Sequence, residues 1–179
     1  MDPSDVFWTR NLVANVRTVV VMRIVARDSA TSASEEKLAD KIFGASGDIV
    51  NLKSRFDECS DGQMQMKPLT TNSKIGTDGV YTIKLPNYDV IGVDAQKVMV
   101  VALSAAQTTL GVHPKDIANH VIMCLPPLTA GNWLAFASIN YWQSAYNDDW
   151  CTYPSALMHE VGTFALSNSY DAISSLIND

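Results

Sequence analysis

His159 and Glu160 are neighbours within residues 153–163, and together they could begin a zinc-binding helix. In the hydrolase motif H-E-x-x-H, two histidines one helical turn apart bind zinc, and the glutamate acts as general base. One turn after His159 the chain has Thr163, whose neutral hydroxyl is a poor zinc ligand beside imidazole or carboxylate. We therefore expect His159 to be a metal ligand and Glu160 a catalytic base, both facing a cavity, without the second histidine that the motif requires.

A catalytic zinc ion needs three protein ligands, which the extended motif H-E-x-x-H-x-x-G-x-x-H supplies. Read without a gap, this chain has Thr163 and Ser169 at the second and third ligand positions. A four-ligand structural site binds zinc with about 10–16 kcal/mol, so two missing ligands cost about 6 kcal/mol, on the order of ten-thousandfold in affinity. Ordinary zinc binding would need ligands recruited from elsewhere. The candidates for recruitment are Asp148, Asp149, Asp171 and His120.

The other residues that could carry chemistry favour structural roles. His113 precedes Pro114 in a loop and His120 opens a strand, so we expect both histidines to be structural. The pair Asp148 and Asp149 is typical of a solvated turn. The sequence contains no G-x-S-x-G elbow, P-loop or G-x-G-x-x-G fingerprint.

Three cysteines, Cys59, Cys124 and Cys151, allow either three thiols or one disulfide with one free thiol. Their spacings of 65 and 27 residues match no compact zinc knuckle. Buried cysteines without any disulfide are one interpretation, since a free cysteine behaves as a small apolar residue. A disulfide between Cys124 and Cys151 is the preferred alternative.

The composition of the 179 residues, 47% hydrophobic and 18% charged, is typical of a folded domain with a sizeable core. The net charge of -6, without clustered basic residues, argues against nucleic acid or anionic membrane as the main partner. The apolar run 16–25 contains Arg17 and Arg23, so it is too short and too charged to span a membrane. No secretory signal pattern is found at the N-terminus.

Apolar periodicity predicts alternating strands and helices, and hence an α/β fold. A β-branched run at 18–26 indicates a strand covered on both faces, and Ser32 with Glu35 has the spacing of a capping box for a helix that ends at Gly44. A second helix is expected at 49–58, with Val50, Leu52 and Phe56 facing inward. The remaining expected elements are strands around 64–66, 80–85 and 120–125, a helix capped by Asp94 through Leu110, an aromatic stretch at 133–141 bounded by interruptions at 129–132 and 146–149, and a last helix from Pro154 or Ser155.

Four blocks of the chain resemble the gametolysin family of algal cell-wall-degrading zinc metalloproteases. They are residues 120–127 (HVIMCLPP), 131–137 (GNWLAFA), 146–151 (YNDDWC) and 155–162 (SALMHEVG). The order and spacing of the blocks match the family as well, and two weaker blocks, 48–54 and 59–68, extend the likeness over about residues 16–170. The resemblance implies a metzincin-like fold, in which a twisted, mostly parallel sheet packs against helices beside a zinc helix.

The resemblance also implies the roles of His159 as first zinc ligand and Glu160 as general base. Family members continue this helix as H-E-[IV]-G-H-N-x-G-L-x-H-S, and the present chain aligns best if one residue is lost near Thr163, which places Asn168 at the third ligand position. The other two zinc ligands therefore have no histidine to match them. No methionine follows Ser169, so the Met-turn of the family has no counterpart either.

We accordingly expect an N-terminal extension at 1–15, followed at 16–179 by a gametolysin-like metallopeptidase domain that keeps only the N-terminal subdomain and is incomplete at its C-terminus. One hypothesis is a metalloendopeptidase acting on cell-wall or matrix glycoproteins whose active site is damaged in this sequence. The alternative is a non-catalytic pseudoprotease that binds protein or glycoprotein. Family members are secreted, so the resemblance implies an extracellular location. It also implies zinc as the metal, which we expect this chain to bind weakly or not at all.

Overall fold

Strand β1 (Asn15–Ala26) runs through the sheet of the computed structural model, which describes residues 15–162. The first half of β1 pairs in parallel with β2 (Met64–Pro68), and its second half pairs in parallel with β3 (Val80–Leu85). Both partners lie on the same edge of β1, because its other edge pairs with β4 (His120–Leu125). The predicted strand at 18–26 is therefore confirmed. It is the common partner of β2 and β3, which together form one edge of the sheet.

The sheet continues beyond β4 through β6 (Gln143–Asn147) to β5 (Ala135–Ala137), which is the edge strand on this side. β6 is parallel to β4, whereas β5 is antiparallel to β6. The predicted α/β fold with a mostly parallel sheet is thus confirmed. The expected interruption at 146–149 is wrong at its start, since Tyr146 lies in β6 and is fully buried.

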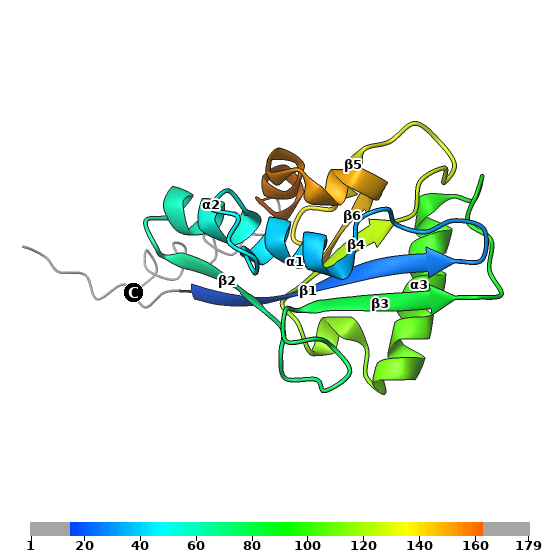
Figure 1. Ribbon diagram of the computed structural model, residues 1–179, viewed down its shortest axis with the longest axis horizontal. Helices are drawn as coiled ribbons and strands as arrows, with labels where there is room; N and C mark the ends of the chain where they lie inside the picture. The colour runs from blue at the N-terminus through cyan, green and yellow to red at the C-terminus, as the bar shows by residue number, and fades with distance from the viewer. Residues whose placement is uncertain (1–14, 163–179) are drawn as a thin grey trace, which may run out of the picture.

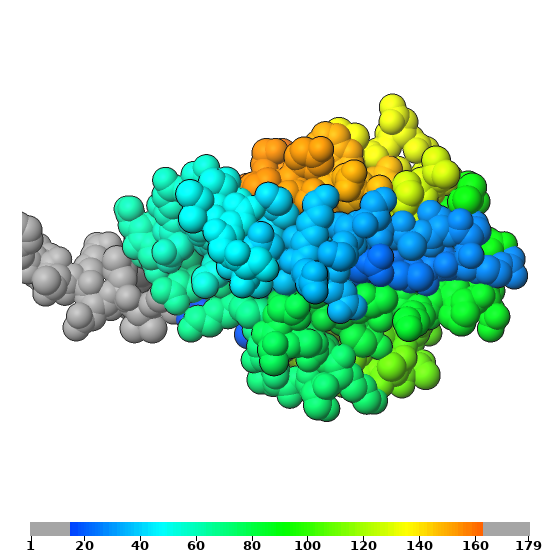
Figure 2. All heavy atoms as spheres, in the orientation of Figure 1, coloured from blue at the N-terminus to red at the C-terminus, as the bar shows by residue number. Residues whose placement is uncertain are grey.

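Helices cover both faces of this sheet (Figure 1). Val19 and Val21 of β1 face α1 (Glu35–Phe43) and α2 (Leu52–Cys59), whereas Val20 and Met22 face α3 (Ala95–Leu110). All four side chains are fully buried, because neighbouring residues of a strand point to opposite faces and both faces are covered. In the space-filling view of Figure 2, the cyan surface of α1 and α2 adjoins the orange surface of residues 148–162.

The N-terminus of α1 differs from the predicted capping box. Ser34, and not Ser32, caps the helix, because the Ser34 side chain accepts a hydrogen bond from the main-chain N–H of Lys37 at 3.2 Å. Ser32 instead donates its N–H and its hydroxyl to the carboxylate of Asp148, at 2.7 and 2.8 Å. The end of α1 at Gly44 is as predicted, with a φ of 73° that favours glycine.

The second helix, α2, begins later than the predicted residue 49. Asn51 caps it by accepting a hydrogen bond from the N–H of Ser54, and the Ser54 side chain accepts one from the N–H of Asn51. Val50 therefore lies before the cap and is exposed, contrary to the prediction, whereas Leu52 and Phe56 are buried as expected. α3 begins at the predicted cap, Asp94, and ends at Gly111.

A short 3-10 helix, η1 (Pro114–Asp116), precedes β4, and a second one, η2 (Asp148–Thr152), follows β6. The predicted N-terminal extension falls outside the described residues except for Asn15, which is the first residue of β1. Within residues 15–162, none of the helices has the length and apolar character needed to cross a membrane.

Candidate functional site

The segment that carries His159 and Glu160 is helical over residues 154–162, as predicted. The carbonyl of Tyr153 accepts the first helical hydrogen bond, from the N–H of Leu157 at 3.0 Å, and Pro154 occupies the first turn, where its missing N–H costs nothing. Leu157 and Val161 are fully buried against the same face of the sheet as α1 and α2. The helix is thus held to the sheet by two apolar residues one turn apart.

This packing sets where the two predicted site residues point. His159 is two positions from both Leu157 and Val161, about 200 degrees around the helix from each, and it is exposed. Glu160 lies at the flank of the buried stripe and is half-buried. The imidazole and the carboxylate therefore occupy different environments, one in solvent and one at the helix–sheet boundary.

Glu160 contacts the edge of the sheet. Its carboxylate accepts a hydrogen bond from the main-chain N–H of Ala137, the last residue of β5. Desolvation raises the pKa of Glu160 above its ordinary value, against the lowering by His159 and by the Ala137 N–H. The Glu160 carboxylate therefore holds its proton more readily than a solvated glutamate.

Beneath this helix lies a layer of buried polar side chains on β4 and β6. His120 Nε2 and Ser144 Oγ share a hydrogen bond of 2.9 Å, and both residues are buried. Burial lowers the pKa of His120 to about 3, so its imidazole is neutral at neutral pH. Burial also raises the pKa of the Tyr146 phenol, and the negative charge of Glu160 adds to that increase. Glu160 and Tyr146 are therefore close enough to interact electrostatically across the helix–sheet boundary.

The residues considered as recruited zinc ligands are engaged elsewhere or lie apart from His159. Asp148 accepts both hydrogen bonds from Ser32 at the surface, and His120 is bonded to Ser144 in the core. Asp149 lies near Lys37, at 3.9 Å between carboxylate and ammonium, and is exposed. Asp171 lies outside the described residues, as do Thr163, Asn168 and Ser169.

A catalytic zinc therefore does not fit the donor set of the described part of the chain. No three His, Cys, Asp or Glu side chains come together there in a way that could hold a metal ion. His159 is available as a ligand because it is exposed, but a single imidazole is two protein ligands short of a catalytic site. Any further ligand would have to come from outside residues 15–162.

The predicted structural role of His113 is confirmed. Its Nδ1 accepts a hydrogen bond from the N–H of Lys115 at 3.2 Å and so caps η1. The ring also packs edge-on against Trp142, with 5.4 Å between the ring centroids. His113 is thus a cap and a packing residue.

Cys124 of β4 and Cys151 of η2 form a disulfide, which resolves the choice left open by the sequence. Both residues are fully buried, and their Cα atoms are 5.7 Å apart. Cys59 is a free, exposed cysteine. The disulfide ties η2, and with it the start of the helix at 154–162, to the central part of the sheet.

Two residues that interact with Glu160 were not predicted from the sequence. Ala137 acts through its main-chain N–H, which no residue type reveals, and Tyr146 belongs to the short polar strand β6. The alternation of Ser144 and Tyr146 with Ala145 was the available signal for that strand.

Comparisons with protein-family models, with curated protein sequences and with solved structures each found no match to this chain.

Proposed function

We propose that this chain is a gametolysin-type zinc metalloendopeptidase by descent, with a metzincin-like fold and a hydrolytic site that is incomplete in this sequence. The proposal is supported by how the four blocks of resemblance lie in space. The first and third blocks are joined by the Cys124–Cys151 disulfide, and the second and fourth by the hydrogen bond from Ala137 to Glu160. Blocks that are separate in the sequence thus form one structural unit around the candidate base.

In this proposal His159 is the retained first zinc ligand and Glu160 is the retained general base. Zinc, when bound in such proteases, acidifies a coordinated water molecule. Glu160 would act by receiving a proton, and the N–H of Ala137 favours the charged form of its carboxylate. Because two of the three protein ligands lack a histidine, we propose that the protein does not hydrolyse peptide bonds at a rate above background.

The proposed substrate or ligand is a protein or glycoprotein outside the cell. A buried disulfide supports an oxidising compartment, since such bonds persist mainly in secreted proteins. The acidic net charge of -6 makes nucleic acid an unsuitable partner. These assignments follow the family resemblance.

The experiment measures bound zinc and peptidase activity on the purified full chain. Metal content is determined by mass spectrometry after dialysis against micromolar zinc, beside H159A and H113A, the latter a control that removes a half-buried histidine with a structural role. Cleavage of casein and of cell-wall glycoprotein is followed with and without a chelator, and in E160Q. We expect less than one zinc per chain and no chelator-sensitive cleavage. Stoichiometric zinc with cleavage that E160Q abolishes would show a complete active site and overturn the proposal.

A non-catalytic pseudoprotease that binds protein or glycoprotein is the second candidate function. It is favoured by large apolar side chains exposed on either side of β5, namely Leu134 and Ile139, which are 52% and 78% exposed. Exposed apolar groups beside an unpaired sheet edge are typical of a protein-binding surface. Binding of immobilised protein to cell-wall glycoprotein should fall in L134D/I139D and stay unchanged in I49D, which alters an exposed isoleucine before α2. Equal binding by both variants would exclude this surface.

A further inference from the structure

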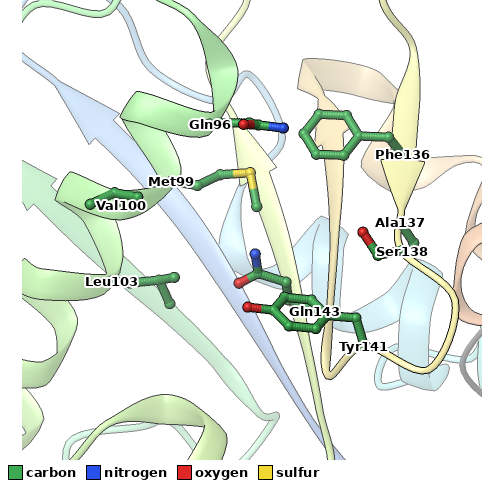
Figure 3. Close-up of a pocket in the computed structure, with 9 residues that line it drawn as sticks. All are labelled: Gln96, Met99, Val100, Leu103, Phe136, Ala137, Ser138, Tyr141 and Gln143. Carbon is green, nitrogen blue, oxygen red and sulfur yellow. The ribbon is translucent and has the colours of Figure 1, made fainter.

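A pocket of about 320 Å³ lies between α3 and the strands β5 and β6. Figure 3 shows that its two ends are formed by Gln96 with Phe136 and by Tyr141 with Gln143. The pocket lies on the α3 side of the sheet, whereas residues 154–162 pack on the other side. No residue of that helix lines the pocket, so it is separate from the candidate zinc site.

The lining of the pocket is uncharged. None of the nine described residues that line it has a charged side chain. A charged ligand would lose part of its hydration on entering the pocket and would find no side chain of opposite charge there to compensate. The lining therefore favours a neutral ligand, although the chain as a whole carries a net charge of -6.

Three of the lining residues offer polar groups that solvent reaches. They are Gln96, Ser138 and Tyr141, all of them exposed. Within residues 15–162 their side chains make no hydrogen bond to another residue. The amide of Gln96 has both donors and an acceptor, and the two hydroxyl groups each donate and accept. A ligand that uses all three must therefore donate and accept at several points, as the hydroxyl groups of a polyol do.

The other walls of the pocket are largely apolar. Phe136 packs against Trp133 with 5.2 Å between the ring centroids, and Tyr141 packs against Trp142 at 5.3 Å. Met99 of α3 also lines the pocket and is 4% exposed. Because each of the two aromatic rings already packs against a second ring, both are positioned before a ligand arrives, which lowers the entropy cost of binding. The matching ligand has an apolar face as well as hydroxyl groups.

We propose that this pocket binds one neutral sugar ring of the pyranose type. A pyranose has both properties, because its C–H groups form apolar faces and its hydroxyl groups project from the rim. Such C–H groups make favourable contacts with the negative face of an aromatic ring. The volume of about 320 Å³ is at the small end of the roughly 300–1,000 Å³ typical of ligand pockets, which suits a single ring. Val100 at the mouth is 67% exposed, so further sugars of a glycan can extend into solvent.

This inference goes beyond the proposed hydrolytic site. Neither a metal ion nor any residue of the helix at 154–162 takes part in the binding. A protein without zinc can therefore still bind the sugar, and a protein with a complete zinc site can fail to bind it. The two proposals are tested by different measurements and can fail separately.

The test titrates the full chain with the methyl pyranosides of glucose, galactose and mannose, followed by ligand-observed NMR. Each is compared with its uronide, in which a carboxylate replaces the CH2OH group. We expect at least one neutral pyranoside to bind with a millimolar Kd and its uronide to bind about tenfold more weakly, because the added charge has no partner in the pocket. Absence of binding by all three neutral pyranosides at tens of millimolar, or a uronide that binds equally or more tightly, would exclude a neutral sugar.

Two matched pairs of variants locate the binding. Y141A removes a pocket tyrosine that packs against a tryptophan, and Y153A removes an exposed tyrosine that packs against Trp150 outside the pocket. Y141A should weaken binding about tenfold, because both a ring contact and a hydroxyl are lost, and Y153A should leave it unchanged. On α3, Q96A should weaken binding about threefold, whereas Q107A alters an exposed glutamine outside the pocket and should not. Unchanged affinity in both Y141A and Q96A would refute binding in this pocket.

A free sugar and the glycan of a glycoprotein present the same ring. A trisaccharide of the sugar that binds best distinguishes these two sources. Tighter binding of the trisaccharide than of the single pyranoside assigns the pocket to a glycan chain, and equal or weaker binding assigns it to a free sugar.

Discussion

The main-chain N–H of Ala137 donates a hydrogen bond to the carboxylate of Glu160 and so joins the edge strand β5 to the helix at 154–162. The two residues belong to different blocks of the sequence and to different layers of the fold. This main-chain donor favours the charged form of the candidate catalytic carboxylate without using another side chain. It also gives the edge strand a contact outside the sheet.

If this hydrogen bond stabilises the fold, its two partners should be thermodynamically coupled. E160A removes the acceptor and A137P removes the donor, and proline is tolerated on an edge strand. A double-mutant cycle by urea unfolding should give a coupling of about 0.5–1 kcal/mol, below the usual value for a charged acceptor because Glu160 is only half-buried. Strictly additive effects of the two substitutions would contradict the contact. E160Q, which keeps an acceptor, should retain most of the stability that E160A loses.

The buried histidine predicts a loss of stability in acid. The pKa of His120 is about 3 in the folded protein and about 6.5 in an unfolded chain, so between these values the unfolded state binds the additional proton. The contribution of neutral His120 to the free energy of unfolding is complete above pH 6.5. It is lost as the pH falls towards 3, by about 1.4 kcal/mol per pH unit. Urea unfolding at pH 7, 6, 5 and 4 measures it.

The matched variant for this prediction is H120Q, whose amide can hydrogen-bond to Ser144 near the position of Nε2 but cannot titrate. Other acidic groups contribute equally to both proteins. The difference in stability between the unmodified protein and H120Q should therefore shrink as the pH falls. A difference that stays constant from pH 7 to pH 4 would place the imidazole in a solvated environment.

The disulfide should account for a measurable part of the stability. Cys124 and Cys151 are 27 residues apart, and closing a loop of this length stabilises a fold by about 3.5 kcal/mol in the chain-entropy estimate. The double variant C124A/C151A should lose about this amount, and reductant should lower the Tm of the unmodified protein but not of the variant. C59S, at the exposed thiol, should change stability by less than about 0.5 kcal/mol. A Tm insensitive to reductant would show that the thiols are not paired.

Restoring the motif should restore part of the metal affinity. T163H recreates the spacing H-E-x-x-H with His159, and one added ligand is worth about 3 kcal/mol, or about 100-fold in zinc affinity. Competition with a chromogenic chelator measures the change. In the double variant H159A/T163H the gain should disappear, because the affinity depends on both histidines. An equal affinity of T163H and the unmodified protein would mean that His159 is not a ligand position.

The elements that were predictable are those whose signals are local. The β-branched run of β1, the apolar run of β4 and the caps Asp94 and Gly44 each contain their own evidence within a few residues. β6 was missed because its sequence, Gln-Ser-Ala-Tyr-Asn, is polar and only five residues long. It is buried because β4, β5 and the helix at 154–162 surround it, and that information is tertiary.

The candidate site is likewise only partly predictable from the sequence. We expected His159 to face a cavity, but Leu157 and Val161 pack against the sheet and leave His159 on the exposed side of the helix. The bond of Ser32 to Asp148 was not predictable, since it joins residues 116 positions apart and competes with a local capping box. The partner of Glu160 could not be read from residue types, because it is a main-chain N–H.

The position of β1 has a consequence for how the chain acquires its fold. Its second edge is completed only by β4, about one hundred residues later, and Thr18 bonds to the side chain of Asn119 across a separation of 101 residues. Long-range parallel pairing of this kind slows folding, because the entropy cost of closing a large loop comes before the stabilising strand contacts form. During synthesis this edge of β1 therefore has no β4 to pair with until β4 leaves the ribosome, and we expect shorter nascent chains to be prone to aggregation through it.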